Sequence, residues 1–406
     1  MNIRPLIAIA IIANIFLPQS YGQANTVVTP SQLLATDVIS QDAPTVDKVE
    51  AADEVFRLFK NHPTGLKING WLAIGNGGLA DHNSTDGRLS PDVVGVNQLG
   101  ISMDKAGDKF RLHLDVLYGR DAGHFRSFSN ANDGWDNSAD FRHGDHAMAL
   151  PQAFVETTAG DWTIKAGHFL ANNPSGQYST DRFFSTRTQG EQAYSPVTLS
   201  GLLGSRKIGE TDVTIGWAQG TNTGFDNLDT FERNGTFVLG LERGLGDKLS
   251  FTYNALFGDM SGLNIPDNVG DLVEGFYHFE HLGGGFPSES ILDEAYYHDL
   301  TLNYEASERL RVALTHVFIT DDTFDGPIVI LRQTTYYILS DHITLGQRYE
   351  NVSLANEFFS ESLSVGVNYQ STRWSNVLLR PEIRWENERG SVNSQTDFFM
   401  DVVIRF

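Results

Sequence analysis

Cysteine, basic residues and long apolar runs are absent or scarce in this sequence of 406 residues. The absence of cysteine excludes a disulfide framework, a thiol nucleophile and a cysteine-ligated metal site. Lysine and arginine total 29 against 51 aspartates and glutamates, and the resulting net charge of −22 argues against a nucleic-acid partner, which requires a basic face. Beyond the N-terminus, no stretch approaches the ~20 apolar residues that a membrane-spanning helix needs.

The first 24 residues have the pattern of a secretory signal peptide. Arg4 is the basic residue, an apolar run extends from about Pro5 to Leu17, and the small residues Gly22 and Ala24 place the predicted cleavage after Ala24. The alternative is a membrane anchor, for which the apolar run is too short. The mature chain is therefore predicted to be exported.

Residues 25–65 show no strand alternation and are predicted to form an N-terminal periplasmic arm. Apolar residues between Val49 and Phe59 recur at near-helical spacing, and Pro63 ends the helix that this spacing predicts. Three interpretations stay open: a short plug, a periplasmic foot, or a marginal helix on a flexible arm.

From residue 66 to the end, apolar and polar residues alternate with a period of two, which places them on opposite faces of β-strands. The C-terminal stretch "DFFMDVVIRF" is typical: Phe398, Met400, Val402, Ile404 and Phe406 share one face. Sixteen strands are predicted, and fourteen is the alternative count because 198–207 and 333–340 have the weakest patterns. The ranges are 67–75, 95–104, 109–119, 149–158, 161–169, 198–207, 211–219, 235–244, 248–258, 294–305, 309–319, 333–340, 343–351, 362–371, 375–386 and 396–406.

Short and long connections alternate along the chain. Short turns such as "KAGD" (105–108) and "GLGDK" (244–248) join pairs of strands, and longer polar loops separate these pairs. The long loops are expected near 77–94, 120–149, 170–197, 220–234, 259–293 and 320–333. This asymmetry indicates an all-β fold: a closed antiparallel transmembrane β-barrel with short periplasmic turns and long extracellular loops.

The barrel must close because lipid offers no partners for the backbone groups of a free edge strand. The apolar face of each strand is expected to meet lipid and the polar face to meet a water-filled lumen. Aromatic residues fall near strand ends, as an interfacial girdle requires. They are Phe110, Tyr118, Trp162, Trp217, Tyr296, Tyr304, Trp385 and Phe406.

Several stretches together resemble the OmpL-like porin family of Gram-negative β-barrel porins. They include "NQLGIS" (97–102), "LHLDVLYGRDA" (112–122), "RFFSTR" (182–187), "IGWAQGTNTGFD" (215–226) and "LLRPEIRWE" (378–386), and they span nearly the whole mature barrel. After "AGHF" the chain reads "LANNPSGQYST" and departs from the Gly-Tyr-Glu-like element usual in the family. The resemblance implies a diffusion channel for small hydrophilic solutes, and no chemistry.

Charged residues on the polar face of the strands are the candidates for lining the pore. They are Arg111, Asp115, Lys165, Arg311, Arg348, Glu350, Arg380, Glu382, Arg384, Glu386, Asp401 and Arg405. With Glu242, Asp299 and Asp397 also on this face, basic residues number seven and acidic residues eight, so the wall alone predicts no strong ion selectivity. Arg380 with Glu382 and Arg384 with Glu386 share one side of a strand, and a salt-bridge ladder that stiffens the wall is the structural interpretation.

One outer loop is expected to fold inward and narrow the pore. The candidate is 170–197, in which Asp181, Arg182, Arg187 and Glu191 mix both signs of charge and would create a transverse field. The second choice is 259–293, which holds seven acidic residues and no lysine or arginine. An acidic mouth would favour cations; solubility and divalent bridging to lipid phosphates are the alternatives.

Three possible motifs for metal binding or catalysis do not match the patterns that such sites require. "DDTFDG" resembles a calcium loop, but Arg332 stands where the bidentate glutamate belongs. His143, Asp145 and His146 could hold a metal, although a solvated loop is the simpler interpretation. Asp81, His82 and Ser84 are mere neighbours in a glycine-rich loop and do not make a triad. No catalytic residue, metal or cofactor is expected.

The leading hypothesis is a passive porin in the outer membrane. The expected partners are outer-membrane lipid and lipopolysaccharide, the assembly machinery that reads the terminal Phe406, and small hydrophilic solutes, with a homotrimer suggested by analogy alone. The alternatives are a barrel enzyme of protease or lipase type, and a binding or structural barrel that the arm plugs. The sequence does not identify the solute.

Overall fold

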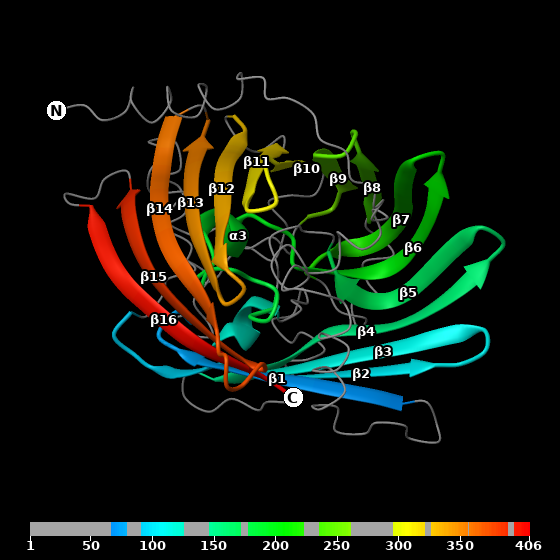
Figure 1. The fold of residues 1–406 in the computed structure, drawn as a ribbon. Helices are drawn as coiled ribbons and strands as arrows, with labels where there is room; N and C mark the ends of the chain where they lie inside the picture. Colours follow the sequence, from blue (N-terminus) through cyan, green and yellow to red (C-terminus); the bar gives the residue numbers. More distant parts are fainter. Residues whose placement is uncertain are drawn as a thin grey trace, which may run out of the picture.

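The computed structural model is a single closed β-barrel of sixteen antiparallel strands (Figure 1). It describes residues 66–78, 91–125, 146–171, 178–222, 235–260, 295–320, 326–355, 357–388 and 394–406. Each strand pairs with its neighbours in sequence, and β1 pairs with β16. The predicted fold class and the count of sixteen strands are thus confirmed. The expected signal peptide and N-terminal arm lie outside the described residues.

The strands match the predicted ranges closely, with two exceptions. Their bounds are β1 Leu66–Gly75, β2 Gly95–Ala106, β3 Phe110–Gly119, β4 Ala147–Ala159, β5 Trp162–Leu170, β6 Thr198–Ile208, β7 Thr211–Thr221, β8 Thr236–Gly244, β9 Leu249–Gly258, β10 Ala295–Glu305, β11 Leu310–Thr320, β12 Ile328–Ser340, β13 Ile343–Leu354, β14 Glu357–Gln370, β15 Val377–Glu388 and β16 Gln395–Arg405. The exceptions are β12 and β14, which begin at Ile328 and Glu357, five residues before the predicted starts at 333 and 362, so the long loop predicted near 320–333 ends at residue 327.

The barrel closes through the last residue of the chain. Gly70 and Phe406 exchange two backbone hydrogen bonds of 2.6 and 2.8 Å, which extends the pairing of β1 with β16. A Cβ atom on Gly70 would lie 2.4 Å from the Phe406 ring, so the ring covers this glycine. The terminal phenylalanine is therefore part of the seam and leaves no free edge there.

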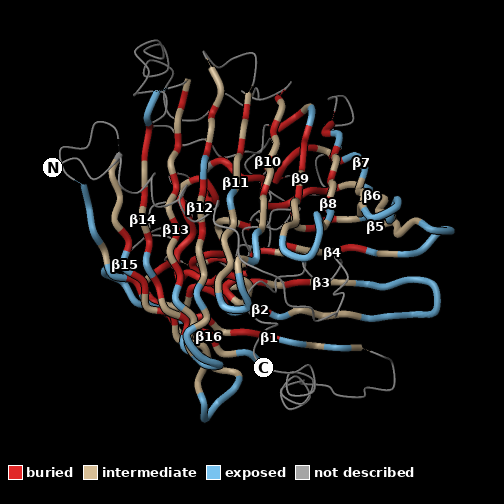
Figure 2. The backbone as a smooth tube through the Cα atoms, turned by 45° about the horizontal axis from the view of Figure 1, so that its top comes forward, coloured by how far each residue is buried: buried red, intermediate tan, exposed pale blue. Residues whose placement is uncertain are grey.

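Side chains alternate between the two faces of the wall as the sequence predicts. On β16, Phe398 and Met400 are exposed on the outer surface, whereas Phe399 and Asp401 are buried inside. Figure 2 shows the same alternation along most strands. No helix among the described residues is long and apolar enough to cross a membrane.

Apolar side chains and a segment of the chain occupy part of the barrel interior. Inward-facing apolar residues of β8–β13 form a buried cluster away from the short turns, which includes Val238, Leu256, Val317, Ile330 and Val352. The stretch 178–197 between β5 and β6 also occupies part of the interior. It contains the short helix α3 (Gln189–Ala193) and lies inside the ring of strands (Figure 1). We call residues 178–197 the inner segment.

Candidate functional site

The inner segment packs where the facing wall has small side chains. On β13 and β14 the inward positions include Gly346 and Gly366; a Cβ atom on Gly346 would lie 2.2 Å from the ring of Phe183, and one on Gly366 would lie 3.2 Å from the ring of Phe184. Ser360, Ser362 and Ser364 continue this narrow face along β14. The absence of bulky side chains on this part of the wall makes the space that the two phenylalanines fill.

Glu382 on β15 is the main anchor of the segment. Its carboxylate accepts hydrogen bonds from the Ser185 hydroxyl at 2.9 Å, the Thr186 N–H at 3.0 Å and the Thr186 hydroxyl at 2.8 Å. Arg348 of β13 lies 3.4 Å from the same carboxylate and donates to the Thr186 carbonyl oxygen at 3.1 Å. The Arg348 guanidinium also stacks over the Phe184 ring, at 4.3 Å from its centroid.

Two arginines of β15, Arg380 and Arg384, also bind backbone carbonyls of the segment. Arg380 donates to the carbonyl oxygens of Ser179 at 2.7 Å and Arg182 at 2.6 Å, and its other nitrogens bind Asp401 of β16. Arg384 donates to the Arg187 carbonyl oxygen at 2.5 Å and pairs with Glu386. These buried guanidinium groups thereby satisfy carbonyls of irregular backbone that would otherwise lack partners inside the barrel.

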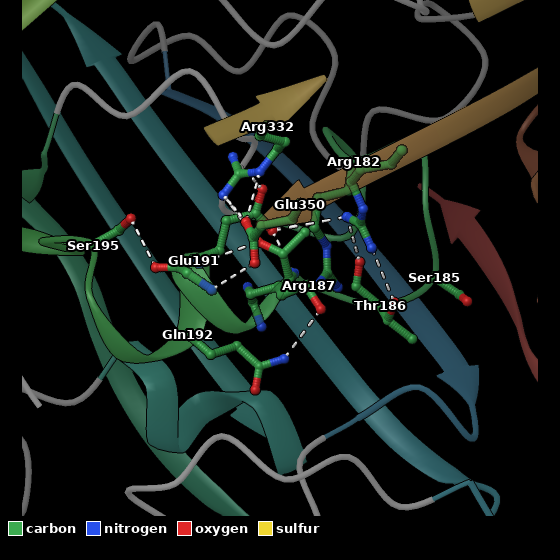
Figure 3. A network of polar contacts seen from close by, with 12 residues as sticks. Arg182, Ser185, Thr186, Arg187, Glu191, Gln192, Ser195, Arg332 and Glu350 are labelled. Carbon is green, nitrogen blue, oxygen red and sulfur yellow. Dashed lines mark hydrogen bonds and ion pairs between the residues drawn. The ribbon is translucent and has the colours of Figure 1, made fainter. Parts of the chain in front are cut away.

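Helix α3 is fixed at its first turn (Figure 3). Thr188 and Glu191 form a capping box, in which each side chain binds the backbone N–H of the other residue. Arg332 of β12 lies 3.0 Å from Glu191, 2.9 Å from the Thr188 hydroxyl and 2.7 Å from Glu350. Glu350 in turn accepts a hydrogen bond of 2.9 Å from the Gly190 N–H.

The other flank of the segment contacts β1–β3. The Tyr178 hydroxyl donates to Asp115 at 2.6 Å, and its ring packs against Trp71 with centroids 4.8 Å apart. Asp121, in the 3-10 helix η2 (Arg120–Phe125) after β3, lies 3.3 Å from Arg182 and 3.2 Å from Arg187. The segment is thus held on both sides, and its own charged residues point into the wall.

The charges of the segment stabilise one another. Burial alone would raise the pKa of Glu191, but Arg332 and Arg348 outweigh burial and hold that pKa below its ordinary value. The same competition, with Arg187 and Arg182 as the cations, lowers the pKa of Asp121. Burial lowers the pKa of Arg182 to about 10, so this guanidinium stays charged at neutral pH.

This charged network is balanced in sign. It pairs six arginines with six carboxylates: Arg182, Arg187, Arg332, Arg348, Arg380 and Arg384 with Asp121, Glu191, Glu350, Glu382, Glu386 and Asp401. Removing one partner of such a buried pair typically costs about 3–5 kcal/mol because the other charge stays buried. The arrangement therefore fixes the position of the segment and adds no net charge to the interior.

The predicted residues divide into two groups. Arg348, Glu350, Arg380, Glu382, Arg384, Glu386 and Asp401 of the wall, with Arg182, Arg187 and Glu191 of the segment, come together in the network. Asp115 and Arg405 also contact the segment, through Tyr178 and the Thr180 carbonyl oxygen. Arg111, Lys165, Arg311 and Asp181 lie outside the network.

The residues outside the network have local partners. Arg111 pairs with Asp104 at 2.6 Å, Arg311 lies 3.8 Å from Glu305, and Lys165 lies over the Phe154 ring at 4.7 Å from its centroid. Asp181 accepts a hydrogen bond from the neighbouring Thr180 hydroxyl at 2.8 Å. Asp181 and Thr180 are the partly exposed residues at the start of the segment.

The salt-bridge ladder expected along β15 is half right. Arg384 does pair with Glu386. Arg380 and Glu382 do not pair with each other, because Arg380 binds Asp401 and Glu382 binds Arg348 and the segment. The charges of β15 therefore join the wall to the segment as well as stiffening the wall.

Two important residues were missed by the sequence analysis. Arg332 was assigned to a calcium-like loop, whereas it lies inside β12 and faces inward; the run from Ile328 to Leu331 ahead of it is apolar at every position, so no alternation marks this strand. Asp121 follows a strand end, and nothing in its local sequence distinguishes it. Three groups lie at least in part outside the described residues: the calcium-like "DDTFDG", the cluster of His143, Asp145 and His146, and the neighbours Asp81, His82 and Ser84.

Most of the acidic loop 259–293 also lies outside the described residues. Within the described ranges, no group of three or more histidines or carboxylates has a geometry that could hold a metal ion.

Comparison with known proteins agrees with this architecture. A family model described as "Putative beta-barrel porin-2, OmpL-like" matches residues 65–406. Among solved structures, OmpT of Vibrio cholerae is 11% identical with a TM-score of 0.50, and the match covers 86% of this chain and 99% of that one. DcaP of Acinetobacter baumannii, an outer membrane channel, is 10% identical with a TM-score of 0.49 and the same coverage. A substituted porin of Rh. blastica is 14% identical with a TM-score of 0.48, covering 84% of this chain and all of its own. No curated protein sequence matches.

Proposed function

Because the chain belongs to the OmpL-like family of β-barrel porins, we propose that it is a passive channel of the Gram-negative outer membrane for small hydrophilic solutes, and that the inner segment narrows the passage. The position of the inner segment inside the barrel carries this proposal. Buried ion pairs and hydrogen bonds to β12, β13 and β15 hold it at that position. Charged groups at a constriction act on a polar solute through their field.

Two sets of wall charges have different roles in this proposal. Arg348, Glu350, Arg380, Glu382, Arg384, Glu386 and Asp401 hold the inner segment in place. Arg111, Lys165, Arg311 and Arg405 remain the candidates for contact with solutes at the wall, and Asp181 is the candidate on the segment; Asp115 is buried and binds Tyr178 of the segment. The network itself is balanced, so the proposed mild preference for cations is supported by the seven acidic residues of loop 259–293 and by the net charge of −22.

We propose no chemistry for the barrel. His113 is the histidine placed most like a catalytic one, at 3.1 Å from both Asp104 and Asp115. Asp115 is also bound by Tyr178 and Gln152, so this group joins the segment to the wall. No serine or threonine hydroxyl is hydrogen-bonded to His113 among the described residues.

Further proposals concern the surroundings of the barrel. Signal-peptide cleavage after Ala24 is tested by the N-terminal sequence of the exported protein. Contact with lipid and lipopolysaccharide, recognition of Phe406 by the assembly machinery and a homotrimer follow from the class of protein and await direct measurement.

Single-channel recording in a planar bilayer, together with liposome swelling in uncharged sugars, tests the proposed function. Steady open steps and swelling that falls with sugar size are the expected result. Because the apolar cluster around Val238 and Ile330 fills part of the interior, a plugged barrel is the second candidate. A folded barrel that neither conducts nor swells liposomes would replace the channel proposal with this one.

A further inference from the structure

The outer surface of the barrel is polar in one sector. Besides tyrosines, six hydrogen-bonding side chains face outward in the interior of β10–β13: His298, His316, Gln333, Thr335, Gln347 and Asn351. Their orientation follows from the register, since they pair with outward-facing neighbours such as Leu300, Leu314 and Leu331. We call these six residues the polar sector.

The wall of β15–β3 has apolar residues at comparable outward positions. Ile383 of β15 and Met400 of β16 face outward and are 56% and 41% exposed. Leu72, Ile101 and Leu114 continue this surface over β1, β2 and β3. The contrast shows that lipid meets the wall of β15–β3 in the proposed membrane barrel, whereas the polar sector has the composition of a different contact.

The side chains of the polar sector use only part of their hydrogen-bonding capacity within the described chain. His298 binds the Tyr296 hydroxyl at 2.8 Å and the facing nitrogen of His316 at 3.2 Å, and Gln333 binds Thr335. A glutamine or asparagine carries two donor hydrogens and an acceptor oxygen, so these contacts leave groups for a further partner. Hydrocarbon offers no such partner.

The chemistry of the sector favours a second copy of this chain over anionic lipid. No lysine or arginine faces outward on β10–β13 in the described ranges, so no cation is present to bind a lipid phosphate. Neutral amides, imidazoles and hydroxyls both donate and accept, so the same kind of surface can pair with itself. Exposed leucines surround the polar groups, including Leu314, Leu331 and Leu345, and they supply apolar contact area.

On these grounds, and resting on the proposed membrane function, we propose that the polar sector of β10–β13 is the contact surface between copies of this barrel. The wall of β15–β3 then faces lipid. This surface does not determine how many copies associate, which the experiments below measure.

Site-specific photocross-linking in intact outer membranes tests this proposal. The full chain carries benzoylphenylalanine in place of Gln333, and the matched control carries it in place of Met400 on the apolar wall of β15–β3. We expect irradiation to double the mass of the Gln333 variant, with peptides of this chain alone in the product, and to leave the control unchanged. Capture of a different protein, capture within one chain, or no capture would overturn the proposal.

A second measurement tests the interface without relying on the photoreactive residue. The double substitution His316→Leu and Gln333→Leu should lower the fraction of oligomer extracted in mild detergent at least tenfold, whereas Met400→Leu should not. An unchanged oligomer would contradict the proposal. Single-channel steps of the same preparations report the channel separately: conducting monomers would refute the interface alone, and silent oligomers would refute the channel alone.

Discussion

Glu382 accepts hydrogen bonds from both the backbone N–H and the hydroxyl of Thr186, at 3.0 and 2.8 Å. The two residues are 196 positions apart, one on β15 and one in the inner segment. This contact is the point at which the wall determines where the segment lies. The consequences for stability and conductance can be measured at this and neighbouring positions.

Glu382→Gln should release the inner segment without changing the shape of the side chain. The substitution leaves Arg348 buried beside a neutral group, and the expected loss is about 3 kcal/mol in the stability of the docked segment. Single-channel recording should show a noisier and larger conductance. Asp397→Asn is the control, because Asp397 faces inward on the next strand and contacts only Gln395 among the described hydrogen bonds. Equal conductance in the two variants would show that Glu382 does not hold the segment.

Gly346→Ala should displace Phe183 from the wall. The added methyl group would lie 2.2 Å from the Phe183 ring, which is confined by Phe184 and Tyr336. Overpacking of this kind typically costs about 1–3 kcal/mol. Gly244→Ala is the matched control, since no heavy atom lies closer than 4.0 Å to its new Cβ. Thermal unfolding of both purified barrels distinguishes them, and equal midpoints would contradict the packing described here.

Thr188→Ala should loosen helix α3. The variant loses the N-terminal cap, worth about 1 kcal/mol, and one acceptor for Arg332. Thr180→Ala serves as the control in the same segment, because the Thr180 hydroxyl binds only its neighbour Asp181 among the described contacts. Limited proteolysis of the folded barrel should cut the Thr188 variant faster within residues 178–197. Identical cleavage rates would argue against a stabilising capping box.

Acidification should undock the segment. The folded-state pKa values of Glu191 and Asp121 are lowered, so their contribution is complete above the ordinary carboxylate range and is lost as the pH falls through the lowered values. Conductance should be steady from neutral pH down to about pH 5 and become irregular below about pH 4. The Glu191→Gln variant should already show irregular conductance at neutral pH, so part of the pH dependence should disappear. A conductance transition confined to pH 6–7 would contradict the assignment to Glu191 and Asp121.

The strands were predictable because one face of each is apolar and the other polar, and this rule failed where the interior is apolar. At the start of β12, Ile328, Val329, Ile330 and Leu331 show no alternation, since Ile328 and Ile330 pack into the buried cluster of β8–β13. The pattern therefore concealed the strand, and with it Arg332.

The sequence predicted which segment turns inward, but not which of its residues contact which residues of the wall. Mixed charges and aromatics in 170–197 indicated an inward segment, which is where residues 178–197 lie. Which wall residue binds which segment residue depends on contacts such as Thr186 with Glu382 or Gly190 with Glu350, and local sequence does not encode these. The polar sector was overlooked for a related reason: a single Gln or His in an apolar face looks like an exception until the neighbouring strands are aligned.

The central claim is that the inner segment lies in the conducting path, and modification of a single introduced cysteine tests it most directly. The natural chain has no cysteine, so Thr180→Cys, at a partly exposed position, gives one reactive site. A negatively charged methanethiosulfonate reagent should lower the single-channel current of this variant in discrete steps and leave the natural chain unaffected. Complete labelling by mass spectrometry with an unchanged current would place the segment outside the path and contradict the account.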